Sequence, residues 1–123
     1  MRWVGNGSHL WRVRVDLFAE DAGGARVAAA HQALQRQLTS ADAAETPGDV
    51  AADQGLGVEG RPVVGLLFWV RADEVGLAAR TAVETARRAG TDSGVGTELY
   101  DVVVIPSAAV ARPTDPKYPT MPD

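Results

Sequence analysis

Residues 62–90, PVVGLLFWVRADEVGLAARTAVETARRAG, carry the strongest structural signal in this sequence. Their first part, residues 63–70, holds no charge and only one hydrogen-bonding side chain, the indole of Trp69. An uncharged run of this length is typical of a central strand that is covered on both faces, and it is too short to span a membrane. Charged residues follow and lead directly into a helical pattern. The stretch therefore predicts a buried strand joined to a helix.

The expected helix begins near Asp73, a residue type that caps helix N-termini, and Glu74 lies favourably in the first turn. Gly90 follows the last helical position, where a left-handed residue is favoured, so we expect the helix to end there. The residues expected to face the sheet are mostly small, which lets the helix approach the sheet closely: Val75, Ala79, Ala82, Ala86 and Ala89.

The sequence on either side of this unit supplies four more elements. Residues 9–19 alternate between apolar and polar side chains, as a half-buried strand does. Residues 25–38 show the apolar spacing of an amphipathic helix. Residues 50–58 form a weaker strand candidate that suits a sheet edge, and residues 99–105 form a last strand that stops at Pro106.

The order strand, helix, strand, strand, helix, strand is similar to the ferredoxin-like fold. We therefore predict the α+β class, a ferredoxin-like βαββαβ chain with a four-stranded antiparallel sheet and two helices on one face. The resemblance covers residues 9–106 and rests on element order, so it names an architecture. The predicted organisation is an N-terminal extension (1–8), one domain (9–106) and a Pro-rich C-terminal tail (107–123).

Composition narrows the function classes. The chain has 123 residues, no cysteine, two histidines and a net charge of −4. Such a chain offers no disulfide or thiolate chemistry, and its mildly acidic charge is poorly suited to nucleic acid. We expect no nucleic-acid partner, no membrane association and a cytoplasmic location. No catalytic residue, metal ligand or cofactor is predicted, and an enzyme is the less favoured class.

The sheet face without helices is the informative feature. The central strand is apolar on both faces, and simple alternation in the last strand puts Tyr100, Val102 and Val104 on one side and Leu99, Val103 and Ile105 on the other. A large exposed apolar patch is rare on a monomeric protein, so something should cover this face. A second copy of the chain is our first expectation, because about 800 Å² per partner suffices for a stable dimer. Cover by the tail is the alternative.

The polar side of the first strand supplies a candidate site. Arg12, Arg14 and Asp16 should point between the sheet and its cover, with Asp101 on the adjacent strand. They are interpreted either as an ion-pair network at a subunit interface or as a site for a small acidic ligand, since guanidinium groups bind carboxylates and phosphates with two hydrogen bonds. The predicted ligand-binding set is Arg12, Arg14, Asp16, Trp69, Tyr100 and Asp101.

The tail has prolines at every third position: Pro113, Pro116, Pro119 and Pro122. This spacing places them along one edge of a polyproline II helix. The tail is interpreted either as a stiff solvated extension or as a docking peptide for a protein partner or a neighbouring subunit.

Two function hypotheses follow. The first is a non-catalytic homodimeric binding or assembly module joined through its sheet faces. The second is a small cofactor-independent enzyme or small-acid sensor with a pocket between sheet and cover, similar in element order and size to the cofactorless monooxygenases of the dimeric α/β-barrel group. A structural component of a phage or mobile element is a third class, which no residue favours.

Overall fold

The computed structural model describes residues 9–40 and 50–106. The predicted extension 1–8, residues 41–49 and the Pro-rich tail 107–123 lie outside these residues. The elements appear in the predicted order: β1 (His9–Phe18), α1 (Gly24–Ser40), β2 (Ala51–Leu56), the short 3-10 helix η3 (Val58–Gly60), β3 (Pro62–Ala72), α2 (Val75–Ser93) and β4 (Leu99–Pro106).

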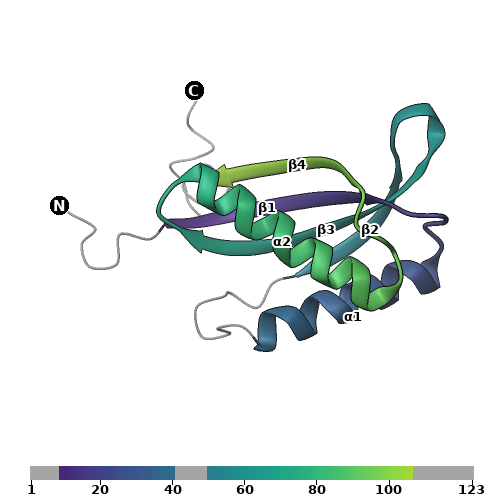
Figure 1. The fold of residues 1–123 in the computed structure, drawn as a ribbon, viewed down its shortest axis with the longest axis horizontal. Coiled ribbons are helices and arrows are strands. Elements are labelled where there is room, and N and C mark those ends of the chain that lie inside the picture. The colour runs from purple at the N-terminus through teal and green to yellow at the C-terminus, as the bar shows by residue number, and fades with distance from the viewer. Residues whose placement is uncertain (1–8, 41–49, 107–123) are drawn as a thin grey trace, which may run out of the picture.

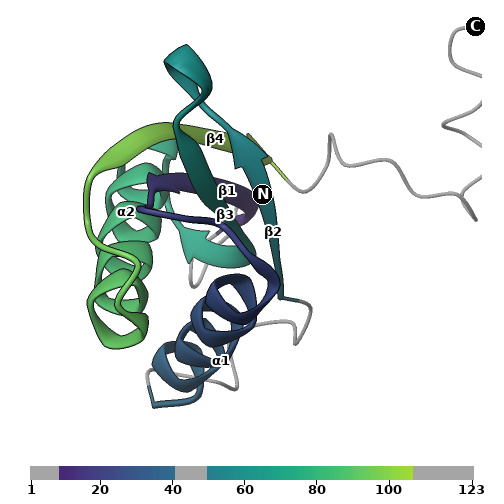
Figure 2. The same ribbon diagram turned by 90° about the vertical axis from the view of Figure 1, so that its right-hand side faces the viewer.

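The four strands form one antiparallel sheet in the order β2-β3-β1-β4. Each helix joins two strands that are not neighbours, so β1 and β3 occupy the centre of the sheet. Both helices lie against the same face, as the two orthogonal views show (Figure 1, Figure 2). The α+β ferredoxin-like βαββαβ architecture is therefore confirmed, with two helices on one side of the sheet.

The core lies between this sheet face and the helices. Val13, Val15 and Leu17 of β1 alternate toward the helices and are almost completely buried, together with Leu66 and Phe68 of β3. The helices meet them mainly with alanines, which let both backbones approach the sheet closely. Removing a large side chain such as that of Phe68 would cost about 3–5 kcal/mol, because so tight a layer cannot close over the cavity. The buried small residues of the helices are Ala30, Ala33, Ala78, Ala82, Ala86 and Ala89.

The N-terminus of α2 differs from the predicted one. The N-cap position is Glu74, not Asp73, and its side chain makes no capping hydrogen bond. The backbone at Glu74 is extended, and its carbonyl accepts the amide of Ala78 at 3.0 Å. The strand-to-helix connection is thus one residue longer than local capping rules predict.

The prediction that α2 ends at Gly90 is wrong. The helix continues to Ser93, and Gly94, with φ of 81°, adopts the left-handed conformation beyond it. Gly90 is buried instead, and its carbonyl accepts the Gly96 amide at 3.1 Å. The missing side chain lets the loop after α2 pack directly on the helix, so this glycine serves a tertiary contact and not a helix end.

The β2–β3 connection projects from the sheet on the side away from the helices (Figure 1, Figure 2). It contains η3, in which Glu59 has a positive φ of 58°. Leu56 and Val58 in this hairpin are exposed. Within residues 9–40 and 50–106, neither helix combines the length and apolar character needed to cross a membrane.

Gly90→Ala should destabilise the fold by about 1–3 kcal/mol, because the added methyl overpacks a closed contact. Its Cβ would lie 3.0 Å from Leu17 Cδ1 and 3.2 Å from the Gly96 carbonyl carbon. The matched control is Gly76→Ala in the same helix, where a Cβ meets nothing within 4 Å. The control should gain about 0.5 kcal/mol from lower unfolded-state entropy. Urea denaturation measures both, and equal effects at the two positions would contradict this role for Gly90.

Candidate functional site

The helix-free face of the sheet carries the candidate site. Because Val13, Val15 and Leu17 point toward the helices, the alternate residues of β1 point away from them. Cross-strand partners share a face, so the register assigns the neighbours of these residues to the same surface. The main members of the helix-free face are Arg12, Arg14, Asp16, Phe18, Asp53, Val63, Gly65, Leu67, Trp69, Tyr100, Asp101, Val103 and Ile105.

Arg14 is the centre of this face and links β1 to β2 across β3. Its Nε donates a hydrogen bond to Asp16 Oδ1 at 3.0 Å. Its Nη1 and Nη2 donate to the two carboxylate oxygens of Asp53 at 3.0 and 2.7 Å. The hydrogen bonds to Asp53 are the largest cause that raises the pKa of Arg14 above its already high value. The guanidinium is thus held by two carboxylates of the same chain in the bidentate geometry that Arg favours.

Gly65 of β3 makes room for this arrangement. A Cβ at this position would lie 2.7 Å from Arg14 Cζ and 2.7 Å from Asp16 Oδ1, closer than real side chains approach. The guanidinium therefore lies flat on the backbone of the central strand. A glycine in a strand interior usually marks such a close approach.

Asp16 is a partly compensated buried charge. The residue is only 8% exposed, and its carboxylate has Arg14 as a partner at 3.0 Å. Burial raises the pKa of Asp16 above its ordinary value of 3.8, although the charge and hydrogen bond of Arg14 act in the opposite direction. Asp101, directly opposite on β4, and Asp53 raise the pKa further by repulsion. Arg14 thus binds two carboxylates, Asp16 and Asp53, while the third, Asp101, repels Asp16.

The remainder of the face is apolar and partly open to solvent. Val103 and Ile105 of β4 are 41% and 38% exposed. Leu67 and Trp69 of β3 are half-buried on the other side of β1, and the Arg12 guanidinium lies 5.2 Å from the Trp69 ring centre. The apolar side chains of β3 and β4 therefore form a border on either side of the polar residues of β1.

The predicted grouping of the β4 side chains is wrong for Tyr100 and Leu99, because β4 does not alternate regularly. The register between β1 and β4 shifts between Asp16 and Leu17, and Leu99 pairs with Leu17. Leu99 consequently packs against the core, together with Val102 and Val104. Tyr100 lies on the helix-free face instead, with its ring 5.0 Å from that of Phe18. Irregular pairing of this kind, which adds one residue to a strand, reverses the side of every residue beyond it.

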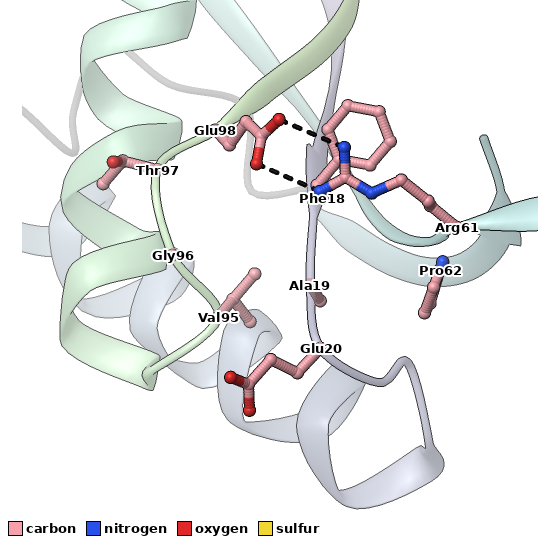
Figure 3. A pocket seen from close by; sticks show the side chains of 9 residues that line it. All are labelled: Phe18, Ala19, Glu20, Arg61, Pro62, Val95, Gly96, Thr97 and Glu98. Atoms are coloured by element: carbon pink, nitrogen blue, oxygen red, sulfur yellow. Dashed lines mark hydrogen bonds and ion pairs between the residues drawn. The ribbon is translucent and has the colours of Figure 1, made fainter. Parts of the chain in front are cut away.

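A second polar feature lies at the base of the β2–β3 hairpin (Figure 3). Arg61 donates two hydrogen bonds to Glu98, at 3.2 and 3.1 Å, and its guanidinium lies 3.8 Å from the centre of the Phe18 ring. The hydrogen bonds from Arg61 lower the pKa of Glu98. An open pocket of about 410 Å³ adjoins this pair. The pair fastens the hairpin to the loop before β4.

The six predicted site residues all lie on the helix-free face. Arg14, Asp16 and Asp101 lie around one point, Arg12 stacks on Trp69, and Tyr100 lies apart near Phe18. Their role in binding a ligand stays a prediction. An incoming small acid would compete with Asp53 for the Arg14 guanidinium.

Sequence reasoning missed Asp53 and Gly65. Asp53 could have been found from two signals taken together. The alternation of residues 50–58 and the register of a hairpin with the central strand place this acid on the same face as Arg14, with one strand between them. Gly65 has a simpler signal, because it is the only glycine inside the uncharged run 63–70.

Comparison with known proteins gives no match: no family model fits the chain, and no curated protein matches its sequence. In the part of the chain that the structure describes, no group of three or more potential ligand side chains is arranged to hold a metal ion. The geometry of the sheet face is what supports a functional proposal.

Gly65→Ala should destabilise the protein by about 1–3 kcal/mol by displacing the Arg14 guanidinium. Gly55→Ala is the control in the adjacent strand, where a Cβ would make an ordinary 3.5 Å contact with Val63. In an Arg14→Ala background the cost of Gly65→Ala should fall by about 1 kcal/mol or more, since residues in contact couple. Urea denaturation of the four-member cycle measures this coupling. Additive effects would show that Gly65 does not serve Arg14.

Asp16→Asn should remove a contribution that lowers stability as the pH rises. Since the folded-state pKa of Asp16 is raised, the native protein binds this proton more tightly than the unfolded chain. The parent therefore loses stability as the pH rises from near 3.8 through the higher folded-state value. Asn keeps an acceptor for Arg14 and lacks the charge, so the variant should gain on the parent across this window, by up to about 1 kcal/mol.

The measurement is urea denaturation of both proteins from acid to neutral pH. The other carboxyl groups are present in both proteins, so their effects largely cancel in the difference. A variant that loses stability relative to the parent as the pH rises would show that the Asp16 charge is net stabilising.

Proposed function

We propose that the protein is a homodimeric binding or assembly module whose two copies pack through the helix-free faces of their sheets. The observation that carries this proposal is the apolar border of that face. Tyr100, Val103 and Ile105 are the exposed large apolar residues of β4, and Leu67 and Trp69 are half-buried on β3, on the other side of β1. Exposed apolar groups gathered on one surface and interspersed with polar residues are typical of an interaction site.

The charges at the centre of the face also suit an interface. A charge that enters an interface unpaired costs several kcal/mol, whereas a charge already held by internal hydrogen bonds costs less. Arg14 enters with three of its nitrogens bonded to Asp16 and Asp53. The cluster can therefore be covered by a second copy without leaving its guanidinium unpaired.

The dimensions of the sheet support a stable dimer. Four strands of about eight residues make a surface of roughly 19 by 27 Å. With side-chain relief, its accessible area is of the order of the ~800 Å² per partner that stable complexes bury. Two such faces pack about 10 Å apart, and a two-fold axis would present the same patch on both copies. Both helical layers would then face outward, where they are open to further partners.

Replacing Val103 and Ile105 together by Gln tests the proposal. These side chains are accessible in the single chain, so the substitutions should leave the fold intact and weaken association. Four altered side chains per dimer should cost about 3 kcal/mol, which raises the dimer dissociation constant roughly 100-fold. Light scattering over a concentration series measures the mass of parent and variant.

Leu77→Gln is the matched control, because Leu77 is 37% exposed and belongs to α2 on the opposite side of the sheet. This variant should keep the parental mass. A parent that stays monomeric over the whole series would refute the proposal, and so would a control that dissociates as readily as the β4 variant.

A further inference from the structure

A second surface lies on the helical side of the sheet, at the end where β1 begins and β4 stops. A pocket of about 450 Å³ opens there beside the start of α2, with walls that include Trp11, Val75 and Pro106. Trp11 is one of the alternate residues of β1 whose side chains face the helices. The pocket is therefore separate from the helix-free face and does not depend on the dimer proposed above.

The aromatic wall of this pocket is rigid and apolar. The Trp11 indole donates its only N–H to the Ala72 carbonyl at 3.0 Å, which fixes the plane of the ring. The His9 ring meets it edge to face, with centroids 6.3 Å apart. Val75 stands beside these rings and is 53% exposed. The pocket thus offers two aromatic rings in an edge-to-face pair and an exposed aliphatic side chain, a surface against which proline rings pack.

The rim of the pocket is acidic. Asp73 and Glu74 line it at the start of α2, and the Glu74 side chain makes no capping hydrogen bond. A basic residue placed among prolines would be attracted to this rim. The tail contains two such residues, Arg112 directly before Pro113 and Lys117 directly after Pro116.

The tail follows directly in sequence from a residue that lines the pocket. Pro106 lines the pocket and ends β4, so the tail of residues 107–123 departs from the pocket wall. Six residues separate Pro106 from Pro113, which is enough for a turn back toward the pocket. So short a connection gives the tail a high effective concentration at the site. From Pro113 the prolines recur every third residue, a spacing that would place them about 9 Å apart along one edge if the segment bound as a polyproline II helix.

We infer that the proline-rich tail of the chain docks in this pocket of its own molecule, with proline rings against Trp11 and Val75 and a basic side chain toward Glu74.

Engineered disulfides in the full chain test this inference, because the chain contains no cysteine. The test pair is Val75→Cys with Thr114→Cys or, in a second protein, with Thr120→Cys, which leaves every tail proline in place. The control pair replaces Val75→Cys by Val58→Cys. Val58 is equally exposed, at 53%, but lies on the β2–β3 hairpin. Each protein is equilibrated in a glutathione buffer, and intrachain bonds are mapped by peptide mass spectrometry.

The tail begins beside residue 75, whereas residue 58 lies at the opposite end of the sheet, so even a freely sampling tail bonds more readily to residue 75. The inference therefore predicts that replacing Pro113, Pro116 and Pro119 by Ala makes the bond to residue 75 at least about tenfold less favourable, measured relative to the bond to residue 58. Glu74→Lys should change this ratio in the same direction. Circular dichroism of each variant checks that the domain remains folded.

Three results would overturn the inference. A preference for residue 75 that is unchanged by the proline replacements would mean that the tail samples the surface without docking. Bonds formed mainly between two chains would place the tail on a second copy. A more favourable bond from residue 75 to Asn6→Cys than to either tail position would assign the pocket to the N-terminal residues 1–8.

Discussion

Two helices can cover only one side of this sheet, and the central strand is apolar on both. β3 alternates between Leu66 and Phe68, which lie beneath the helices, and Leu67 and Trp69, which do not. The helical side is closed by alanines at close range. The opposite side has no such layer among the described residues, and its apolar border is the feature from which the proposed association follows.

At the centre of the helix-free face, Arg14 and its carboxylate partners show how charged groups are accommodated on a surface proposed to bind a second copy. Arg14 reaches across β3 only because Gly65 has no side chain, and it then binds carboxylates from two different strands. The arrangement fastens the edge strand β2 to the middle of the sheet. It also leaves Asp16 with a raised pKa, because one guanidinium does not offset its burial and the neighbouring Asp101. The same residues thus stabilise the sheet and determine the charge of its face.

Much of the fold could be predicted from the sequence, because periodicity and turn residues are local signals. The sequence correctly predicted the order of the elements and the central position of β3. It also predicted that the polar residues of β1 share the face opposite its core residues. Errors arose where a distant contact overrides a local rule. Gly90 has the local character of a helix end, yet the loop at Gly96 packs on it and the helix continues.

The candidate site was predictable to the extent that it lies on one strand. Arg12, Arg14 and Asp16 share a face by simple alternation. The grouping of Tyr100 with Val102 and Val104 was predicted wrongly, because an irregularity in pairing cannot be read from LYDVVVI alone. Asp53 was missed for a related reason: it contacts Arg14 across β3, and only the register of two hairpin strands brings them together.

Nuclear Overhauser spectroscopy with isotope filtering tests the proposed role of the helix-free face most directly. A sample that mixes isotope-labelled and unlabelled chains reports only contacts between different molecules. The account predicts intermolecular contacts from the methyl groups of Leu67, Val103 and Ile105, and none from the core methyls of Val13 and Leu34. Intermolecular contacts confined to the helices, or absent altogether at concentrations where a dimer should form, would contradict it.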